Sequence, residues 1–447
     1  MSRDLPEALT DRLRRGPASG SELCRALEIS QPTLSRAIRP LEARGQVVRF
    51  GSTRGARYGL ARAVAARGSQ WPLYRIDASG TPQQLGPLFA IAPDHYHVRG
   101  GPTRMATLSD GLPYYLQDAR PAGFLGRAIP SAHPDLALPP RVQDWSDDHV
   151  LTFLTRRGSE NIGDLILGAD ALDRHLSGRH GPPLIEESER GTRYPQFADE
   201  AMSGAPAGSS AQGEHPKFGV RVRSPRGIVQ SLVKFSPPRD TEIGQRWADL
   251  LIAECLASEF LAAQGIATAR SHIVEAGARV FLESERFDRL GGEGRRGVVT
   301  LHAVDTDRYG QLDRWAAAAA RLRRDGLLHA TDTAQLALLD TFAELIGNTD
   351  RHFGNVSLFD DQVGPFTLAP MYDMLPMVFA PADGQLVERE FAPGSARAET
   401  LAEWPRAREL ALGYWSRLAS DDRLSEGFRR RARACRDIVA RKTITPM

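Results

Sequence analysis

The first 60 residues change from helical to extended spacing of apolar positions. Segments 5–15, 19–30 and 30–46 repeat apolar residues every three or four positions, as amphipathic helices do. The run VVRFGSTRGARYGL then alternates as two short strands around a basic, glycine-rich turn. Three helices followed by a basic hairpin predict a winged helix-turn-helix domain at residues 1–67.

Capping residues indicate where these predicted helices begin and end. Ser21 is the expected N-cap of the second helix, and Ser30, with Pro32 in the first turn, marks the start of the third. Gly45 suits the end of the third helix, because glycine readily adopts the left-handed conformation found there. Residues 61–70 have the composition of a short linker.

The next part of the chain is β-rich and then helical. Short apolar runs (WPLYRID, PLFAIAP, HYHVRG) alternate with Pro and Gly between residues 71 and 140, which predicts a small β-containing domain without catalytic signals. Residues 145–177 return to helical spacing, with Ser159 as the expected N-cap of the second helix there.

From residue 218 the pattern becomes a β-hairpin, a long helix and two further strands. FGVRVR and IVQSLVKF are strands joined by the turn SPRG, and the helix IGQRWADLLIAECLASEFLAAQG ends at Gly265. A later helix at 333–346 leads directly into GNTDRHFGN, and a second hairpin, VSLFDDQVGPFTLAPMYD, ends at Asp373. These elements place polar loops at the ends of helices and strands, where chemistry is often located.

Composition limits the class of protein. The chain has 447 residues with 41% hydrophobic and 25% charged, which indicates a globular protein of two to four domains. No apolar run approaches the roughly 20 residues of a spanning helix, and the charged start lacks a signal-peptide core. We therefore expect a cytoplasmic protein without a membrane partner. Three scattered cysteines exclude a disulfide framework or a zinc site of cysteines.

Charge is distributed unevenly. Residues 1–67 carry 13 arginines against six acidic residues, a net charge of +7, whereas the whole chain carries +2. A basic end on a nearly neutral body favours a DNA-binding module. In a winged helix-turn-helix the third helix enters the major groove. The expected DNA contacts are Gln31, Thr33, Ser35, Arg36 and Arg39 on that helix, with Arg49, Arg54 and Arg57 on the wing. A small helical domain used for protein contacts is the alternative.

Lysine is scarce, and its positions suggest a special role. Of 57 basic residues only Lys217, Lys234 and Lys442 are lysine. Lys217 ends the Gly/Ser-rich loop directly before the predicted hairpin, and Lys234 lies on the second strand of that hairpin. Because lysine offers a compact ammonium group where arginine offers a planar fork, these two positions are candidates for binding phosphates.

The order of the polar elements matches a phosphoryl-transfer cleft. A flexible loop, a strand lysine (Lys234) and a helix acid (Glu254) precede a loop with Asp350 and Asn355, and Asp373 follows. In such clefts the lysine neutralises ATP phosphates, one aspartate accepts the proton of the acceptor hydroxyl, and oxygen ligands hold Mg²⁺. Each element alone has a structural interpretation: a linker, an edge charge, a solvated helix residue, or a turn with His352 packed structurally. The ordered combination favours a kinase.

GNTDRHFGN followed by APMYDM resembles the catalytic and metal-binding loops of HipA-family serine/threonine kinases, the toxins of bacterial toxin–antitoxin systems. ESERFDR and SLVKFSPP are similar to that family's hinge and lysine strand. The resemblance implies an α+β fold with two kinase-like lobes. The fusion of an N-terminal helix-turn-helix domain to the kinase resembles the domain arrangement of the YjjJ-like branch of the family.

The resemblance also implies residue roles. Asp350 becomes the catalytic aspartate with His352 as loop support, and Asn355 and Asp373 become magnesium ligands. The nucleotide-binding set would comprise Lys234, Glu254, Lys217, Gly213, Ser209 and Ser210, with Glu283 and Glu285 bracketing the adenine-contacting hinge. Ser209, or else Ser210, would be a site of inactivating autophosphorylation in the phosphate loop. Gly354 departs from the family, which often has a basic residue there.

These observations predict an ATP- and Mg²⁺-dependent serine/threonine protein kinase with its own DNA-binding domain. The expected division is a winged helix-turn-helix (1–67), a small β-containing region (68–145), a kinase N-lobe (146–285) and a mainly helical C-lobe (286–447). Expected partners are operator DNA and a protein substrate, of the translation machinery in related toxins; a small antitoxin and a homodimer stay open. The alternatives are a transcription regulator whose kinase-like body senses nucleotide or is inactive, and a small-molecule or lipid kinase.

Overall fold

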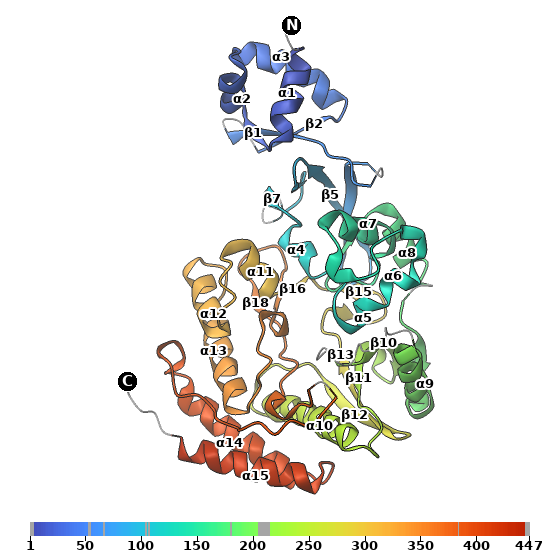
Figure 1. Ribbon diagram of the computed structural model, residues 1–447, viewed down its shortest axis with the longest axis vertical. Coiled ribbons are helices and arrows are strands. Elements are labelled where there is room, and N and C mark those ends of the chain that lie inside the picture. Colours follow the sequence, from blue (N-terminus) through green and yellow to red (C-terminus); the bar gives the residue numbers. More distant parts are fainter. Residues whose placement is uncertain are drawn as a thin grey trace. The chain divides into compact units, whose positions relative to one another are not determined.

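The computed structural model describes residues 4–51, 55–65, 68–102, 105, 108–178, 181–203, 215–382 and 384–442 (Figure 1). The chain forms two compact units. The first comprises Met1–Asp77, Thr81–Arg120 and Pro134–Gly181, and the second comprises Ala78–Gly80, Pro121–His133 and Pro182–Met447. Within the described residues, no helix has the length and apolar character needed to cross a membrane.

The first unit begins with three helices and a small antiparallel sheet of order β1-β3-β2. Buried leucine and isoleucine side chains at helical spacing form their common core. The elements are α1 (Leu5–Arg14), β1 (Ala18–Ser19), α2 (Gly20–Leu27), α3 (Gln31–Ala43), β2 (Val47–Phe50) and β3 (Arg57–Leu60). The predicted helices and hairpin strands are therefore present.

Ser30 caps α3 as predicted, and Gly45 follows its last residues with a φ of +67°. The predicted N-cap of α2 is wrong by two positions. Ser19, in extended conformation, accepts the amide of Glu22, and the Glu22 carboxylate accepts the Ser19 amide 2.7 Å away. This reciprocal pair satisfies two amides at the helix start, which Ser21 inside the helix could not do.

A five-stranded sheet of order β7-β6-β5-β4-β8 forms the rest of the first unit, and each neighbouring pair of strands is antiparallel. The three predicted β runs are strands. The elements are β4 (Gln70–Ile76), β5 (Pro82–Ile91), β6 (His95–Val98), β7 (Ser109–Asp110), α4 (Tyr114–Gln117), α7 (Asp147–Arg157), β8 (Leu165–Leu167) and α8 (Ala169–Leu176), with 3₁₀ turns at Pro134–Leu136 and Val142–Asp144.

Two expectations for this region are wrong. Ser159 does not cap a helix, because the apolar run Leu165–Leu167 pairs with β4 and α8 begins only after Gly168. The linker predicted at 61–70 is tied to the rest of the unit: Ala61 forms a bridge to Ile91 of the sheet, and an Nη1 atom of Arg62 lies 2.7 Å from Asp148 on α7.

The second unit is built on a sheet of order β12-β13-β11-β10-β9. The hairpin of β10 and β11 places Lys217 opposite Lys234, and Lys234 in turn lies opposite Leu282 of β13. Aromatic side chains of α9 pack on one face of this sheet, against Val233, Phe235 and Phe281. The elements are β9 (Leu184–Glu186), the 3₁₀ turn Glu187–Glu189, α9 (Arg190–Ser203), β10 (Lys217–Ser224), β11 (Gly227–Phe235), α10 (Glu242–Ala263), β12 (Ser271–Ala276) and β13 (Arg279–Glu285).

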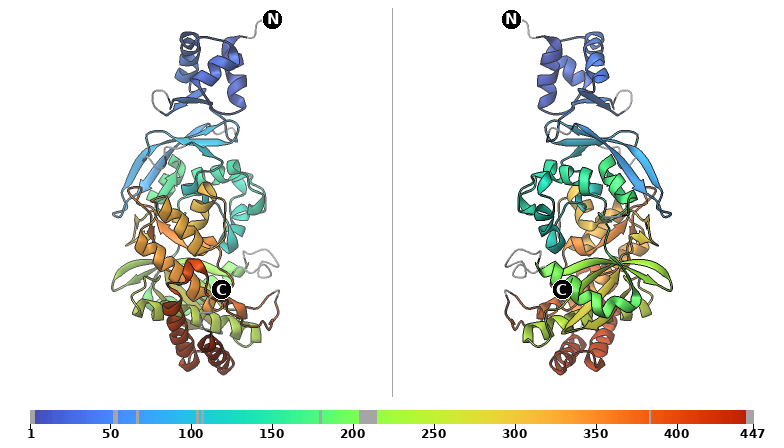
Figure 2. Two further views of the ribbon diagram at one scale, coloured as in Figure 1. Left: turned by 90° about the vertical axis from the view of Figure 1, so that its left-hand side faces the viewer. Right: turned by 90° about the vertical axis from the view of Figure 1, so that its right-hand side faces the viewer.

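The remainder of the second unit is mainly helical. In Figure 2, as in Figure 1, α14 and α15 lie side by side at the C-terminal end. The elements are α5 (Gly123–Arg127), α6 (Ile129–Ala132), β14 (Arg289–Leu290), β15 (Gly294–Arg295), β16 (Val298–Thr300), α11 (Leu301–Arg308), α12 (Trp315–Arg324), α13 (Ala330–Leu345), β17 (Ser357–Phe359), β18 (Thr367–Leu368), α14 (Trp404–Ser420) and α15 (Glu426–Arg441), with 3₁₀ turns at Phe353–Asn355, Met377–Phe379 and Ala398–Thr400.

Candidate active site

Three charged side chains predicted from separate parts of the sequence meet in the second unit. The ammonium nitrogen of Lys234 on β11 lies 2.7 and 2.8 Å from the carboxylate oxygens of Glu254 on α10. It also donates a hydrogen bond to Asp373, which follows β18. The side chains of Lys234 and Glu254 are nearly buried, whereas that of Asp373 is 30% exposed. The cluster is therefore open on the aspartate side.

Burial and charge act against each other in this cluster. Burial alone would lower the pKa of Lys234, but the carboxylates of Asp373 and Glu254 raise it, so the ammonium group stays charged. Burial raises the pKa of Glu254, and the attraction of Lys234 offsets only part of that effect. Burial also opposes ionisation of Asp373, yet Lys234 and Lys217 lower its pKa to about 2. Asp373 is thus an ionised carboxylate that can bind a cation.

Asp373 has an unusual backbone conformation. Its φ is +53°, in the left-handed region that residues other than glycine seldom adopt. Strained residues of this kind are concentrated at functional sites, where the surrounding structure holds them in place. Here the side chain of Asn348 donates to the Asp373 carbonyl at 3.2 Å.

The loop GNTDRHFGN connects α13 to a 3₁₀ turn at Phe353–Asn355. Asp350 and His352 are 54% and 59% exposed at the side chain, with 3.8 Å between the Nε2 atom of His352 and an Asp350 oxygen. Asn355 is buried, and its side-chain amide donates to the Asp350 carbonyl at 2.8 Å. The Asp350 side chain is thus exposed to solvent, and the buried side chain of Asn355 stabilises the loop through its hydrogen bond to the Asp350 backbone.

Asn348 joins this loop to Asp373. Besides its bond to the Asp373 carbonyl, its side-chain oxygen accepts the Asp350 amide at 3.1 Å. Sequence reasoning missed this residue, although it lies in the quoted motif, because a buried asparagine with two backbone partners cannot be told from a turn residue by spacing alone.

Arg351 anchors the loop to the helical part of the second unit. An Nη1 atom of Arg351 lies 3.0 Å from an oxygen of Asp340 on α13, and Arg314 lies 3.4 Å from the same carboxylate. The indole of Trp315 donates to the His352 carbonyl at 3.3 Å. Sequence reasoning missed these contacts too, since their partners come from α12 and α13.

His215 is a further group that sequence reasoning missed. Its imidazole lies beside Trp247, with ring centroids 4.6 Å apart. Burial, together with the ammonium groups of Lys234 and Lys217, lowers the pKa of His215 to about 3, so the ring is neutral. Because opposed residues of paired strands point to the same side of a sheet, Lys217 shares the face of Lys234.

Gly354, where the chain departs from the family pattern, has a local explanation. The ring of His352 accepts the Gly354 amide at 3.1 Å, and a Cβ atom at Gly354 would lie 2.9 Å from the same ring nitrogen. A side chain at position 354 would displace the His352 ring, so the observed position of that ring depends on the glycine.

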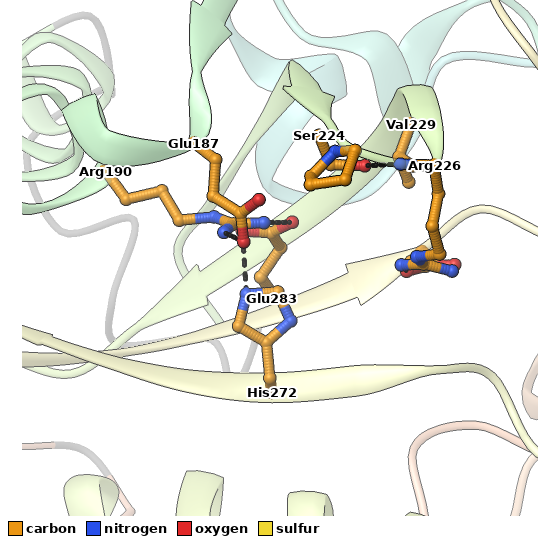
Figure 3. Close-up of a pocket in the computed structure, with 9 residues that line it drawn as sticks. Glu187, Arg190, Ser224, Arg226, Val229, His272 and Glu283 are labelled. Atoms are coloured by element: carbon orange, nitrogen blue, oxygen red, sulfur yellow. Dashed lines mark hydrogen bonds and ion pairs between the residues drawn. The ribbon is translucent and has the colours of Figure 1, made fainter.

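The two predicted hinge acids lie apart from this cluster. Glu283 is opposite Val233, so it points to the other face of the sheet from Lys234. Its carboxylate accepts hydrogen bonds from Arg190, Tyr194 and Ser231, and Figure 3 shows Arg190 and His272 pointing toward it. Burial opposes ionisation of Glu283, but its donors, foremost His272 and Arg190, lower its pKa to about 2. Glu285 pairs with Arg226.

The predicted DNA-contacting side chains of the first unit are mostly exposed. On α3 the buried face consists of Leu34, Ile38 and Leu41. The remaining face carries the exposed residues Gln31, Ser35, Arg36 and Arg39, with Thr33 half-buried. Arg49 and Arg57 are exposed on β2 and β3, and a guanidinium nitrogen of Arg57 donates to the Pro17 carbonyl at 2.9 Å. Arg54, Ser209, Ser210 and Gly213 lie outside the described residues.

Comparisons with known proteins find relatives for most of the chain. Residues 67–176 match the YjjJ-like toxin middle domain, and residues 209–442 match the HipA-like C-terminal domain. The chain is 37% identical over 425 residues to Toxin YjjJ of Escherichia coli (strain K12), covering 94% of each protein. The chain belongs to the YjjJ-like toxins of the HipA family. This bears out the family resemblance inferred from GNTDRHFGN and its companion motifs.

Solved structures give the fold of this family. HipA of Shewanella oneidensis MR-1, in a structure with HipB and its operator DNA, superposes with a TM-score of 0.52 at 15% identity, over 83% of this chain and 95% of that one. The Helicobacter pylori proinflammatory kinase CtkA matches 51% of this chain and 88% of its own, with a TM-score of 0.36 and 11% identity, too low to carry an argument. The fold is thus a mixed helix-and-sheet, HipA-like one.

Proposed function

We propose that this HipA-family chain is an ATP- and Mg²⁺-dependent serine/threonine protein kinase of the cytoplasm. The observation that carries the proposal is the convergence of Lys234, Glu254 and Asp373 from a strand, a helix and a loop. The proposal retains the four regions at 1–67, 68–145, 146–285 and 286–447. The open side of the cluster, at Asp373, is where a phosphate-bearing ligand has access.

The chemistry of the donor set fits a nucleotide with its metal ion. Asp373 is ionised and partly exposed, and Asn355 adds an amide oxygen, so both can serve as oxygen ligands for Mg²⁺. Bound ATP supplies the transferable phosphoryl group, and the metal offsets its negative charge. Lys234, held by Glu254, is the cation that orients phosphates. Asp350, exposed on its loop, accepts the proton of the acceptor hydroxyl.

The other residues assigned from the sequence have supporting roles in the proposal. Gly213 and Lys217 belong to the proposed phosphate loop, GSSAQGEHPKF, and His352 supports the catalytic loop. Glu283 contributes to the hinge through its strand, because its side chain is engaged on the other face of the sheet. Glu285 marks the end of the same strand. Autophosphorylation of Ser209, or else Ser210, would add negative charge beside the nucleotide phosphates and oppose their binding.

We also propose that residues 1–67 form a winged helix-turn-helix that binds operator DNA, with a protein substrate, a small antitoxin or a second copy as further partners. The supporting observation is the exposed polar and basic face of α3 opposite its buried leucines. Arg36 and Arg39 lie on that face without an ion pair among the described residues. They are therefore available for phosphates or base edges.

The kinase proposal is tested with purified protein, Mg²⁺ and γ-labelled ATP, followed by phosphosite mapping. Wild-type protein is expected to label Ser209 or Ser210, and Asp350→Ala is expected to lower the rate by about 10²–10⁴-fold, because the loss of a general base has effects of that size. Full labelling by Asp350→Ala would refute the assigned role. ATP binding without labelling of any protein would favour a nucleotide-sensing regulator.

DNA binding is tested by measuring the affinity for the chain's own promoter at several salt concentrations. Arg36→Ala and Arg39→Ala are each expected to weaken binding. Where the arginine contacts a phosphate, its loss should also reduce the slope of log affinity against log salt concentration by about one. Asp350→Ala serves as the matched control with unchanged affinity. Salt-independent or unaltered binding in the arginine variants would contradict the proposed interface.

A further inference from the structure

The side chain of Tyr372 joins the two segments of the second unit that carry the proposed metal ligands. Tyr372 directly precedes Asp373 in the sequence, and Gly354 directly precedes Asn355. The phenolic hydroxyl of Tyr372 donates a hydrogen bond to the Gly354 carbonyl at 2.8 Å, across 18 positions of the chain. One side chain therefore links the backbone beside one ligand to the backbone beside the other.

A second hydrogen bond and a ring contact hold the Tyr372 side chain in this position. Its hydroxyl also lies 2.8 Å from the hydroxyl of Ser357, a buried residue of β17. A carbonyl can only accept, so the single phenolic proton goes to Gly354, and Ser357 is the donor in the other bond. The Tyr372 ring contacts that of Phe287, with centroids 5.8 Å apart. The side chain is thus fixed both at its ring and at its hydroxyl.

The backbone is held on both sides of the Tyr372–Gly354 bond. On the catalytic loop, the Gly354 amide donates to the His352 ring at 3.1 Å. On the other segment, the amide and the carbonyl of Met371 are hydrogen-bonded to the backbone at 267–269, at 3.0 and 2.8 Å. Each end of the link is therefore fixed to its own part of the unit.

Backbone pairing between the two segments ends before the ligands are reached. The strand β18, which pairs with β17, ends at Leu368, and the Ala369 amide then donates to the Ser357 carbonyl at 3.0 Å. Past that bond, the Tyr372 side chain continues the connection as far as Gly354. The spacing of the two segments beside the ligands therefore depends on the tyrosine hydroxyl.

The link acts directly on the backbone of Asn355. The Gly354 carbonyl and the Asn355 amide belong to one planar peptide unit. Tyr372 holds the carbonyl end of that unit, and the His352 carbonyl accepts the Asn355 amide at 3.0 Å. The side-chain nitrogen of Asn355 is used by the Asp350 carbonyl, so its side-chain oxygen is the atom that can bind a cation. The orientation of this oxygen follows from the orientation of the peptide unit.

We propose that Tyr372 is a positioning residue that sets the distance between the two metal ligands, and thereby the preference of the site for Mg²⁺ over larger cations. This inference rests on the proposed function, because it takes Asp373 and Asn355 as the ligands. Mg²⁺ requires near-ideal octahedral geometry with short bonds to oxygen, whereas Ca²⁺ accepts longer bonds and variable geometry. A link that fixes the spacing of the ligand segments favours the smaller ion.

The test measures metal binding without turnover, on the full-length protein with an ATP analogue that has an imido group as its β,γ-bridge. Bound Mn²⁺ is followed by electron paramagnetic resonance and displaced by Mg²⁺ or by Ca²⁺ in separate titrations. Tyr372→Phe keeps the ring contact with Phe287 and loses only the hydroxyl. Its affinity for Mg²⁺ should fall by about tenfold, as is typical of residues that orient metal ligands, and its affinity for Ca²⁺ should fall less.

Two further variants locate the effect. Ser357→Ala removes the donor to the Tyr372 oxygen but leaves the Gly354 bond, so the preference should shift in the same direction by a smaller factor. Tyr309→Phe is the matched control, because it loses a hydroxyl that donates to Asp325 at 2.6 Å, outside the site. It should bind both ions as wild type does. Denaturant titration without metal shows whether each variant is folded, and the Ser357→Ala result decides if Tyr372→Phe is not.

The inference is overturned if Tyr372→Phe binds Mg²⁺ as wild type does, or if its affinities for Mg²⁺ and Ca²⁺ fall by the same factor, as general loosening of the site would cause. An equal change of preference in Tyr309→Phe would also overturn it. If wild-type protein has no nucleotide-dependent Mn²⁺ site, the proposed function fails and this inference fails with it. If the wild-type site is present and the preference of Tyr372→Phe is unchanged, this inference alone fails.

Discussion

The two faces of the β12-β13-β11-β10-β9 sheet each hold a buried charge with opposite charges around it, yet the two clusters differ in what they leave free. On one face Lys234 faces two carboxylates, and the Asp373 side chain remains 30% exposed. On the other face Glu283 is 1% exposed and is surrounded by the donors of Arg190, Tyr194 and Ser231. The first cluster is partly exposed at the Asp373 carboxylate itself, whereas in the second the Glu283 carboxylate is buried at the wall of a cavity of about 350 Å³.

This difference separates a site from a structural anchor. A buried ion whose hydrogen bonds are made within the chain stabilises one arrangement of elements and has less left to offer a ligand. Glu283 fixes α9 to the sheet in this way. Lys234 and Asp373 keep each other charged at an accessible position, which is what binding a phosphate or a metal ion requires.

The largest expected effect is on stability, at the cluster around Glu283. Glu283→Ala leaves Arg190 partly buried without its main partner, so the free energy of unfolding should fall by about 3–5 kcal/mol. Denaturant titration measures it. Glu275→Ala on β12, whose pair with Arg239 is half exposed, is the matched control and should cost less than about 1 kcal/mol. Loss of ATP binding in folded Glu283→Ala protein would contradict the structural role.

Next is the loss of phosphoryl transfer at the open cluster. Lys234→Ala removes a preorganised cation, so the rate at saturating ATP should fall by about 10²–10³-fold per folded molecule. Lys442→Ala changes the third lysine of the chain and should leave the rate unaltered. Equal activity of Lys234→Ala and wild type would mean that the cluster is no more catalytic than Glu283.

A smaller effect is expected at the link between the catalytic loop and Asp373. Asn348→Ala removes two buried hydrogen bonds and should lower the free energy of unfolding by about 1–3 kcal/mol, together with activity. Asn348→Asp keeps the acceptor for the Asp350 amide but loses the donor to the Asp373 carbonyl. If the link positions Asp373, this variant should raise the KM for ATP. Expressed as a free energy, the rise in KM should exceed the fall in the free energy of unfolding.

The last effect concerns pH, and it is the smallest within any single pH unit. Because the pKa of Glu283 is lowered from about 4.5 to about 2, its contribution to stability is fully present above pH 4.5 and is lost as the pH falls toward 2. Wild-type protein should lose up to about 1.4 kcal/mol per pH unit in that interval through this group. Glu283→Gln should show a shallower slope, measured by denaturant titration at each pH; an unchanged slope would remove Glu283 from the acid-sensitive groups.

Periodicity predicted most elements of both units, because their apolar spacing is regular. The helix that carries Glu254, the hairpin that carries Lys234 and the helix before GNTDRHFGN all form within a few residues of their predicted ends. The wrong predictions arose where two nearby residues or two structures could both fit the sequence. Ser19, and not Ser21, formed the capping pair of α2, and the apolar run after Ser159 became a strand of the sheet and not a helix.

The sequence by itself determined the elements, the family and the set of polar residues, since spacing and motif order are written along the chain. Only the tertiary structure decided which of those residues meet. Lys234 and Glu283 lie on adjacent strands one register position apart, and the alternation of a β-strand sends them to opposite faces. Asn348 and His215 contact partners distant in sequence, Asp373 and Trp247, because contacts between remote segments depend on packing that no local pattern records.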